Sequence, residues 1–293
     1  MNADRGEVPH ADEGPESPSI SEWRPGADLP ELNSREIRVW IVDLDSGLHP
    51  DNVETEEPGP ELGLLSEDER ARAARFVRAR DRRRFARCRA SLRQILGGLL
   101  RESPHSLRFR ATGQGKPELD FKTMGVNEGD ARAAIRFNVS HSSDLALIGV
   151  CRGHELGVDV ERIKRISEAD RIVASFFSPA ERAEFATIPD DLKALAFFRG
   201  WTRKEAVLKG LGTGLAGLAA QYETGFGMTE LPAYFIPATP SPRVEQWQLW
   251  EAAPRAGFVA TVAVGVPLSD DSAEPARRGA VGGVAYPVEK SVH

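Results

Sequence analysis

Apolar residues recur along the chain in two patterns, one typical of strands and one typical of amphipathic helices. Glu36 to Leu44 is rich in β-branched and aromatic side chains, which predicts a strand. A loop rich in Gly, Pro and acidic residues follows over 45–63, and Ser66 and Glu69 then have the spacing of a capping box at a helix start. The next apolar positions recur at helical spacing and predict one long helix: Phe85, Cys88, Leu92, Ile95 and Leu99.

Shorter apolar runs in the middle of the chain predict further strands. A short strand is expected at 106–110, and three longer ones at 135–140, 145–151 and 155–161. The residues 152–154, Arg-Gly-His, separate the last two and predict a hairpin turn.

The second half of the chain repeats this plan. The segment 178–185, SPAERAEF, opens a helix with Pro at the first helical position, as 66–76, SEDERARAARF, opens the earlier one. A long helix is expected over 191–210 and a β-meander over 222–266. We therefore predict an α+β fold, a pseudo-dimer of two similar halves. Each half would be a small, mostly antiparallel sheet packed on a long helix, with a ligand cleft between the halves.

The length of 293 residues suits one large or two small domains. Residues 1–35 are rich in Pro, Gly and acidic residues and predict a disordered N-terminal tail. An N-terminal half over 36–150 and a C-terminal half over 151–268 follow, and 269–293 resembles the first tail and predicts a flexible C-terminal tail.

Composition narrows the function classes. No apolar run approaches the ~18 residues that a membrane span needs, and the acidic N-terminus lacks the basic start of a signal peptide. The two cysteines, Cys88 and Cys151, form no CxxC motif, so a reducing cytoplasm is expected. A net charge of −6 argues against general nucleic-acid binding, yet the arginine-rich segment 69–89 indicates a local polyanion site or an acidic partner.

The segment 157–161, GVDVE, carries the first candidate chemistry. On a strand, Asp159 and Glu161 point the same way, while Val158 and Val160 face the core. Two adjacent carboxylates repel each other, and a divalent cation such as Mg²⁺ relieves that repulsion. The alternative is a solvated polar strand face.

The segment 201–209, WTRKEAVLK, predicts a helix on which Glu205 and Lys209 lie one turn apart. Glu205 would complete a Mg²⁺ site, and Lys209 would serve a phosphate. The alternative is an ordinary surface ion pair.

Two further segments offer groups that can hold anions. In 137–142, FNVSHS, neighbouring Ser140 and His141 point to opposite faces, which disfavours a hydrolase and favours phosphate contacts at a strand end. Lys116 in 113–117, GQGKP, could clamp an anion. The alternatives are a strand-terminating turn and an ordinary loop.

These four segments, in this order, resemble the signature series of Sfp-type 4′-phosphopantetheinyl transferases over roughly 36–265. The resemblance implies a pseudo-dimer that binds coenzyme A and Mg²⁺ in its cleft. It implies metal ligands at Asp159, Glu161 and Glu205. It implies coenzyme A contacts at Lys116, Ser140, His141, Lys209, Arg80 and Arg84.

The reaction implied is attack of a serine hydroxyl of an apo acyl- or peptidyl-carrier protein on the β-phosphorus of coenzyme A, which releases 3′,5′-ADP. Glu205 is the candidate base, and Lys209 would stabilise the transition state. The WxxKEA form indicates service to polyketide, nonribosomal-peptide or broad carrier systems. A monomer is expected, without membrane or nucleic-acid partners. A coenzyme A-binding regulatory module and a Mg²⁺-dependent nucleotide pyrophosphatase are the alternatives.

Overall fold

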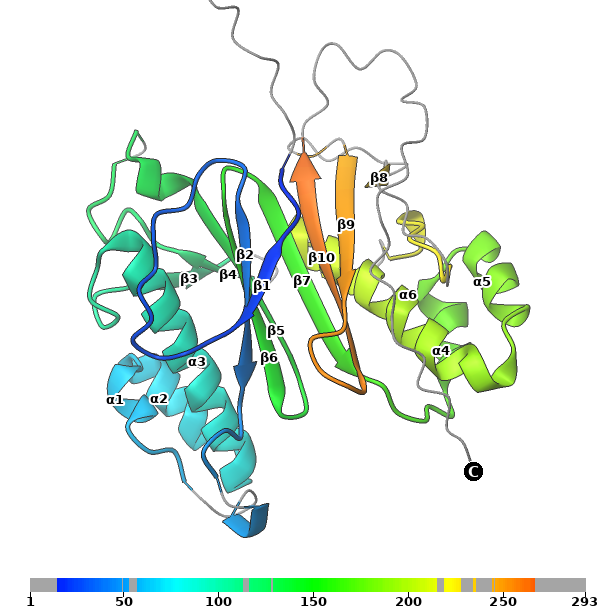
Figure 1. Ribbon diagram of the computed structural model, residues 1–293, viewed down its shortest axis with the longest axis horizontal. Coiled ribbons are helices and arrows are strands. Elements are labelled where there is room, and N and C mark those ends of the chain that lie inside the picture. The colour runs from blue at the N-terminus through cyan, green and yellow to red at the C-terminus, as the bar shows by residue number, and fades with distance from the viewer. Residues whose placement is uncertain are drawn as a thin grey trace, which may run out of the picture.

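Two four-stranded sheets lie at the centre of the molecule, and each carries a 22-residue helix on its outer side (Figure 1). The computed structural model describes residues 15–48, 50–52, 57–112, 116–127, 129–214, 219–227, 234–235, 244 and 246–266. Over the same part of the chain, no helix combines the length and the apolar character that crossing a bilayer would require.

The first sheet has the strand order β1-β2-β6-β5 and the second has the order β7-β10-β9-β8. All neighbours in the two sheets are antiparallel except β1 and β2, which are parallel. The first sheet comprises β1 (Ser19–Glu22), β2 (Ile37–Asp43), β5 (Ile135–Ser142) and β6 (Leu145–Arg152). The second comprises β7 (Glu155–Arg162), β8 (Tyr234–Phe235), β9 (Gln246–Ala252) and β10 (Phe258–Val266). A separate hairpin joins β3 (Phe109–Ala111) to β4 (Pro117–Leu119).

The helices flank the sheets in two groups. The first group is α1 (Glu61–Leu64), α2 (Glu67–Ala74) and α3 (Ala79–Leu100), and the second is α4 (Ala169–Phe176), α5 (Pro179–Ala186) and α6 (Asp190–Leu211). Short 3₁₀ turns occur at Pro50–Asn52, Ala131–Ala134 and Ala219–Gln221. A capping box forms at both predicted helix starts, those of α2 and α5.

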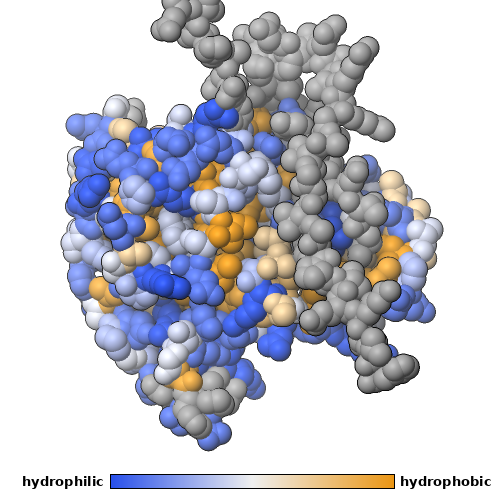
Figure 2. Space-filling model, viewed as in Figure 1, coloured by the Kyte–Doolittle hydropathy of each residue, from blue (hydrophilic) through white to orange (hydrophobic). Residues whose placement is uncertain are grey.

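Successive side chains on a strand point to opposite faces of its sheet, so the apolar core is divided into layers. On β2, Trp40 and Val42 pack with α3, whereas Ile37 and Val39 pack in a cluster that both sheets share. The shared cluster continues on β7 and β10, whose opposite faces meet α6. The sheets therefore lie face to face between α3 and α6, and apolar side chains show over the central strands in the space-filling view (Figure 2).

The α+β class and the mostly antiparallel sheets are confirmed. The descent of the two halves from one duplicated unit, and their boundary at 150/151, stay predictions. Much of the predicted meander and the whole predicted C-terminal tail, 269–293, lie outside the described residues.

The N-terminal segment corrects the prediction of a disordered tail over 1–35. Ser19–Glu22 pairs in parallel with β2, and Trp23 packs edge-on against Trp40 with ring centroids 6.5 Å apart. The open edge of β2 and this aromatic contact order a segment whose composition alone indicates disorder. The predicted strand at 106–110 also begins later, at Phe109.

Candidate active site at the seam between the sheets

Edge strands β5 and β7 lie side by side without a backbone hydrogen-bond ladder. Side chains of β5 take the place of that ladder, because every second residue from 138 to 142 is polar and points toward β7. Each accepts a backbone N–H of β7: Asn138 Oδ1 from Val158 at 2.9 Å, Ser140 Oγ from Val160 at 3.3 Å and Ser142 Oγ from Arg162 at 3.2 Å. The two sheets are thus joined by a polar seam.

Asp159 lies at the centre of this seam. It is buried and, unlike its neighbours Val158 and Val160, it is not part of the apolar cluster that the two sheets share. Lys209 Nζ from α6 lies 2.5 Å from Oδ1 of Asp159, and the hydroxyl of Ser140 donates to the same oxygen at 2.8 Å. Lys209 also donates to Ser140 Oγ at 2.9 Å, so the three groups form a closed network.

A glycine explains how β7 and α6 come so close. A Cβ built on Gly157 would lie 1.8 Å from the carbonyl oxygen of Ala206 and 2.6 Å from the backbone nitrogen of Gly210. The two backbones are therefore in direct contact. That contact brings Asp159, two residues further along β7, within reach of Lys209.

The three acidic residues interact through their charges. Burial raises the pKa of Asp159, and the nearby Lys209 ammonium opposes the rise. Burial is also the main cause that raises the pKa of Glu161, to which the negative charge of Asp159 adds. For Glu205, burial and then the charge of Asp159 raise the pKa to about 7.

The acids fit a hard cation in their donor chemistry. All their donors are oxygens, which Mg²⁺ prefers, and Oδ2 of Asp159 is buried without a hydrogen-bond partner. The positions of the acids do not match those of a formed metal site. Among the described residues, no group of three or more His, Cys, Asp or Glu has the arrangement of a metal site. Lys209, not a second carboxylate, is the group closest to Oδ1 of Asp159.

Ser140 and His141 have different surroundings, as their adjacent positions on a strand predict. Ser140 is buried in the seam, whereas His141 is exposed. Surrounding protein atoms lower the pKa of His141, and the positive charges of Lys209 and Arg72 add to this effect while Asp159 opposes it. Lys209 and Arg72 are therefore near enough for their positive charges to act on His141.

Lys116 lies outside this network. Its Nζ donates to the carbonyl oxygen of Gly210 at 2.9 Å and to that of Leu156 at 3.4 Å, and it lies 3.8 Å from Glu155. In this structure Lys116 ties the start of β4 to the last turn of α6. Gly113 to Gly115 lie outside the described residues.

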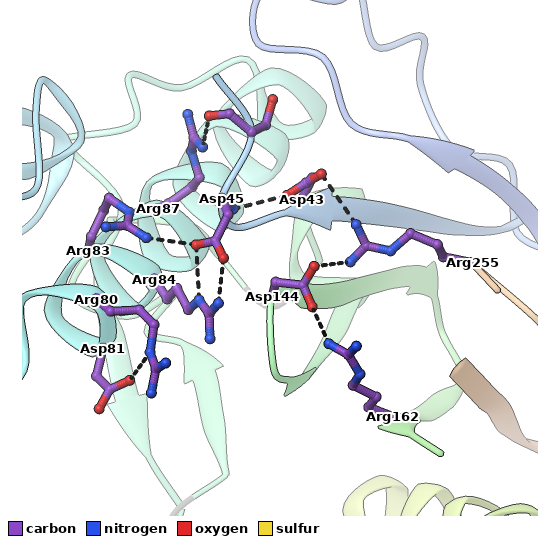
Figure 3. Close-up of polar contacts among 11 residues, drawn as sticks. Asp43, Asp45, Arg80, Asp81, Arg83, Arg84, Arg87, Asp144, Arg162 and Arg255 are labelled. Carbon is purple, nitrogen blue, oxygen red and sulfur yellow. Dashed lines mark hydrogen bonds and ion pairs between the residues drawn. The ribbon is translucent and has the colours of Figure 1, made fainter. Parts of the chain in front are cut away.

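Arg80 and Arg84 of α3 each pair with an aspartate (Figure 3). Arg84 binds Asp45 with both arms of its guanidinium group, with Nε 3.0 Å from Oδ1. Arg83 donates to the same Oδ1 at 2.7 Å, and Arg80 lies 3.4 Å from Asp81. Their predicted contacts with coenzyme A stay predictions.

Other residues of the WTRKEA segment anchor α6. Lys204 is fully buried and donates to Glu181 at 2.9 Å and to the carbonyl oxygen of Ala219 at 2.9 Å. Trp201 packs in an aromatic cluster, stacked on Phe197. Sequence reasoning missed these roles and the roles of Asn138 and Ser142. The alternation of polar residues from 138 to 142 was the available signal for the last two.

Glu205 makes stability depend on pH. Its folded-state pKa of about 7 lies above the 4.5 of an unperturbed glutamate, so the stability it contributes is present below pH 4.5 and is lost as the pH rises through 7. We expect Glu205→Gln to raise the Tm of metal-free protein at pH 8 by roughly 2–4 °C, which corresponds to about 1 kcal/mol.

Thermal unfolding of both proteins in a chelator, at pH 5 and at pH 8, measures this effect. The gain should be small at pH 5, where Glu205 is already protonated. An equal gain at both pH values would show that Glu205 is not the titrating group.

Two family models match this chain. Residues 155–262 match a family model described as the 4′-phosphopantetheinyl transferase superfamily, and residues 59–152 match one described as 4′-phosphopantetheinyl transferase, N-terminal. Ser140 and His141 lie in the segment 59–152. The segment 155–262 contains Asp159, Glu161, Glu205 and Lys209.

Curated relatives carry the same description. The chain is 35% identical over 246 residues to the 4′-phosphopantetheinyl transferase HetI of Nostoc sp., which covers 83% of this chain and 93% of the relative. It is 34% identical over 180 residues to a putative 4′-phosphopantetheinyl transferase of Synechocystis sp., covering 61% and 66%. It is 26% identical over 157 residues to the human L-aminoadipate-semialdehyde dehydrogenase-phosphopantetheinyl transferase, covering 52% and 49%. The chain therefore belongs to the 4′-phosphopantetheinyl transferase superfamily, a family of transferases.

Proposed function

We propose that this enzyme transfers the phosphopantetheine arm of coenzyme A to a serine of an apo acyl- or peptidyl-carrier protein. The serine oxygen forms a bond to the β-phosphorus, the bond from that phosphorus to its bridging oxygen breaks, and 3′,5′-ADP leaves. The main support is the geometry at the seam. There Lys209 contacts the buried Asp159, whose charge helps to raise the pKa of Glu205 to about 7.

Glu205 is suited to accept the proton of the carrier serine. General bases work best when their pKa lies near the operating pH, and in the metal-free protein burial raises the pKa of Glu205 to about 7. An ordinary glutamate, with a pKa of ~4.3, would be a weak base. A cation held by Glu205 would lower this pKa, so the role of Glu205 as base rests on the sequence resemblance and on its place near Asp159.

Lys209 is suited to stabilise negative charge on the transferred phosphoryl group. An ammonium group has three N–H donors, and two of them are used by Asp159 Oδ1 and Ser140 Oγ. Its side chain is 31% exposed, so the third donor can meet a phosphate oxygen at the surface of the seam.

Asp159, Glu161 and Glu205 would hold Mg²⁺, with Oδ2 of Asp159 as the oxygen that lacks a partner. When bound, the cation supplies Lewis-acid polarisation and charge neutralisation at the diphosphate. His141, on which the charges of Lys209 and Arg72 act, would contact the same diphosphate.

The test is incubation of the protein with coenzyme A, Mg²⁺ and a panel of apo acyl- and peptidyl-carrier proteins, followed by mass spectrometry of each carrier. We expect at least one carrier to gain the mass of the phosphopantetheine arm, and none to gain it in a chelator. Binding of coenzyme A without transfer to any carrier would indicate a regulatory module instead. Release of adenosine phosphates without a carrier would indicate a pyrophosphatase.

A further inference from the structure

Two serine–carboxylate pairs repeat along the seam with the same spacing. Ser140 Oγ donates to Asp159 Oδ1 at 2.8 Å, and Ser142 Oγ donates to Glu161 Oε2 at 2.7 Å. In each pair the carboxylate lies 19 positions after the serine. Because side chains on a strand repeat every two residues, one register between β5 and β7 produces both pairs.

Each serine is also fixed in place by the backbone of β7. Ser140 Oγ accepts the N–H of Val160, and Ser142 Oγ accepts the N–H of Arg162. A hydroxyl that accepts a hydrogen bond from a strand and donates one to a side chain of the same strand has little freedom to rotate. The serines therefore hold the two carboxylates at a defined height along β7.

We propose that Ser140 and Ser142 are positioning residues, which hold one oxygen of Asp159 and of Glu161 so that the other oxygen of each faces a divalent cation. This rests on the proposed function, since it concerns the same acids. It differs from the phosphate contact that the family resemblance implies for Ser140.

The hydrogen-bond capacity of Ser140 supports this assignment. A serine hydroxyl has one proton and two lone pairs. Ser140 gives its proton to Asp159 and accepts from both Lys209 and Val160, so its capacity is used in full. No donor or acceptor remains on this side chain for a phosphate oxygen.

The second carboxylate oxygen of each acid has no hydrogen bond to a described serine. Oδ2 of Asp159 is buried without a hydrogen-bond partner. Within the described part of the chain, Glu161 likewise forms its side-chain hydrogen bond through Oε2, to Ser142, and none through Oε1. Each pair thus has one oxygen fixed by a hydroxyl and one oxygen available as a ligand for a hard cation.

Asn138 provides a matched control within the same seam. It accepts the N–H of Val158 at 2.9 Å, as the serines accept theirs, but the residue 19 positions later is Gly157, which has no carboxylate. A change at Asn138 therefore weakens the seam without touching an acid.

The experiment measures the affinity of the full-length protein for Mn²⁺, a paramagnetic stand-in for Mg²⁺, by electron paramagnetic resonance. We expect Ser142→Ala to weaken Mn²⁺ binding about tenfold, as the loss of groups that orient metal ligands commonly does. Ser142→Thr keeps the hydroxyl and should bind Mn²⁺ nearly as wild type does, whereas Ser142→Val, of similar shape, should behave like Ser142→Ala. Asn138→Ala should lower the Tm and leave the affinity unchanged.

Several results would overturn the inference: no Mn²⁺ binding by the wild type, equal affinities for Ser142→Ala and wild type, or equal losses in Ser142→Thr and Ser142→Val. A loss of affinity in Asn138→Ala as large as that in Ser142→Ala would also overturn it, because seam stability would then explain both. If Mn²⁺ affinity depends on the hydroxyl but no carrier is modified, the proposed function fails and the positioning role stands.

Discussion

Asp159→Asn is expected to lower the rate of phosphopantetheine transfer by about three orders of magnitude while the protein remains folded. The carboxylate interacts with the Lys209 ammonium and raises the pKa of Glu205, so removing its charge alters both candidate catalytic groups. It also removes a candidate metal ligand whose Oδ2 has no other partner.

The fold should survive this change because asparagine keeps the shape and the bonds of the buried side chain. Its amide oxygen can accept from Ser140 and Lys209 as Oδ1 does, and its amide nitrogen takes the place of the unpartnered Oδ2. Loss of a buried charge also removes the desolvation that raises the pKa of Asp159.

Initial rates with a carrier that the wild type modifies, together with the Tm of each protein, test this expectation. Asp130→Asn is the matched control, since Asp130 also pairs with a basic residue, Arg132, in a half-buried ion pair that does not include Lys209 or Ser140. Transfer by Asp159→Asn at more than about a tenth of the wild-type rate would mean that this carboxylate does not take part in the chemistry.

Local periodicity explains which parts of the site the sequence could predict. A two-residue repeat separates Asp159 from its apolar neighbours, and a one-turn spacing puts Glu205 and Lys209 on one side of a helix. The predicted helix over 191–210 agrees with α6 to within one residue at each end. The capping boxes of α2 and α5 depend on residues three positions apart, and they too were predictable.

The remaining features depend on contacts between distant segments. Lys116 binds the carbonyl oxygen of Gly210, 94 positions away, and nothing near the GKP segment indicates that partner. The pKa of Glu205 reflects its burial beside β7, which a sequence motif does not reveal. Ser140 was assigned to phosphate by resemblance, because its bonds to Lys209 and Val160 appear only when β5, β7 and α6 are assembled.

Gly157→Ala is expected to destabilise the protein by about 3 kcal/mol or more, at the upper end of the cost of overpacking a core. The added methyl group would lie 1.8 Å from the carbonyl oxygen of Ala206, which is backbone and cannot rotate away. The backbone of α6 at Gly210 cannot shift away either, because the ring of Trp247 packs against it: a Cβ built on Gly210 would lie 2.3 Å from that ring. The strand β7 would have to move away from α6.

That movement should also separate Asp159 from Lys209, whose 2.5 Å contact depends on the same approach of strand and helix. We therefore expect a drop in Tm of roughly 6–12 °C, at about 2–4 °C for each kcal/mol, and a loss of transfer in the protein that remains folded. Gly63→Ala is the control, because Gly63 has no atom within 4 Å of a built Cβ and alanine is the better helix former. If Gly157→Ala melted at the wild-type temperature, the strand and the helix could not be in backbone contact, and the geometry that joins the lysine to the buried aspartate would be wrong.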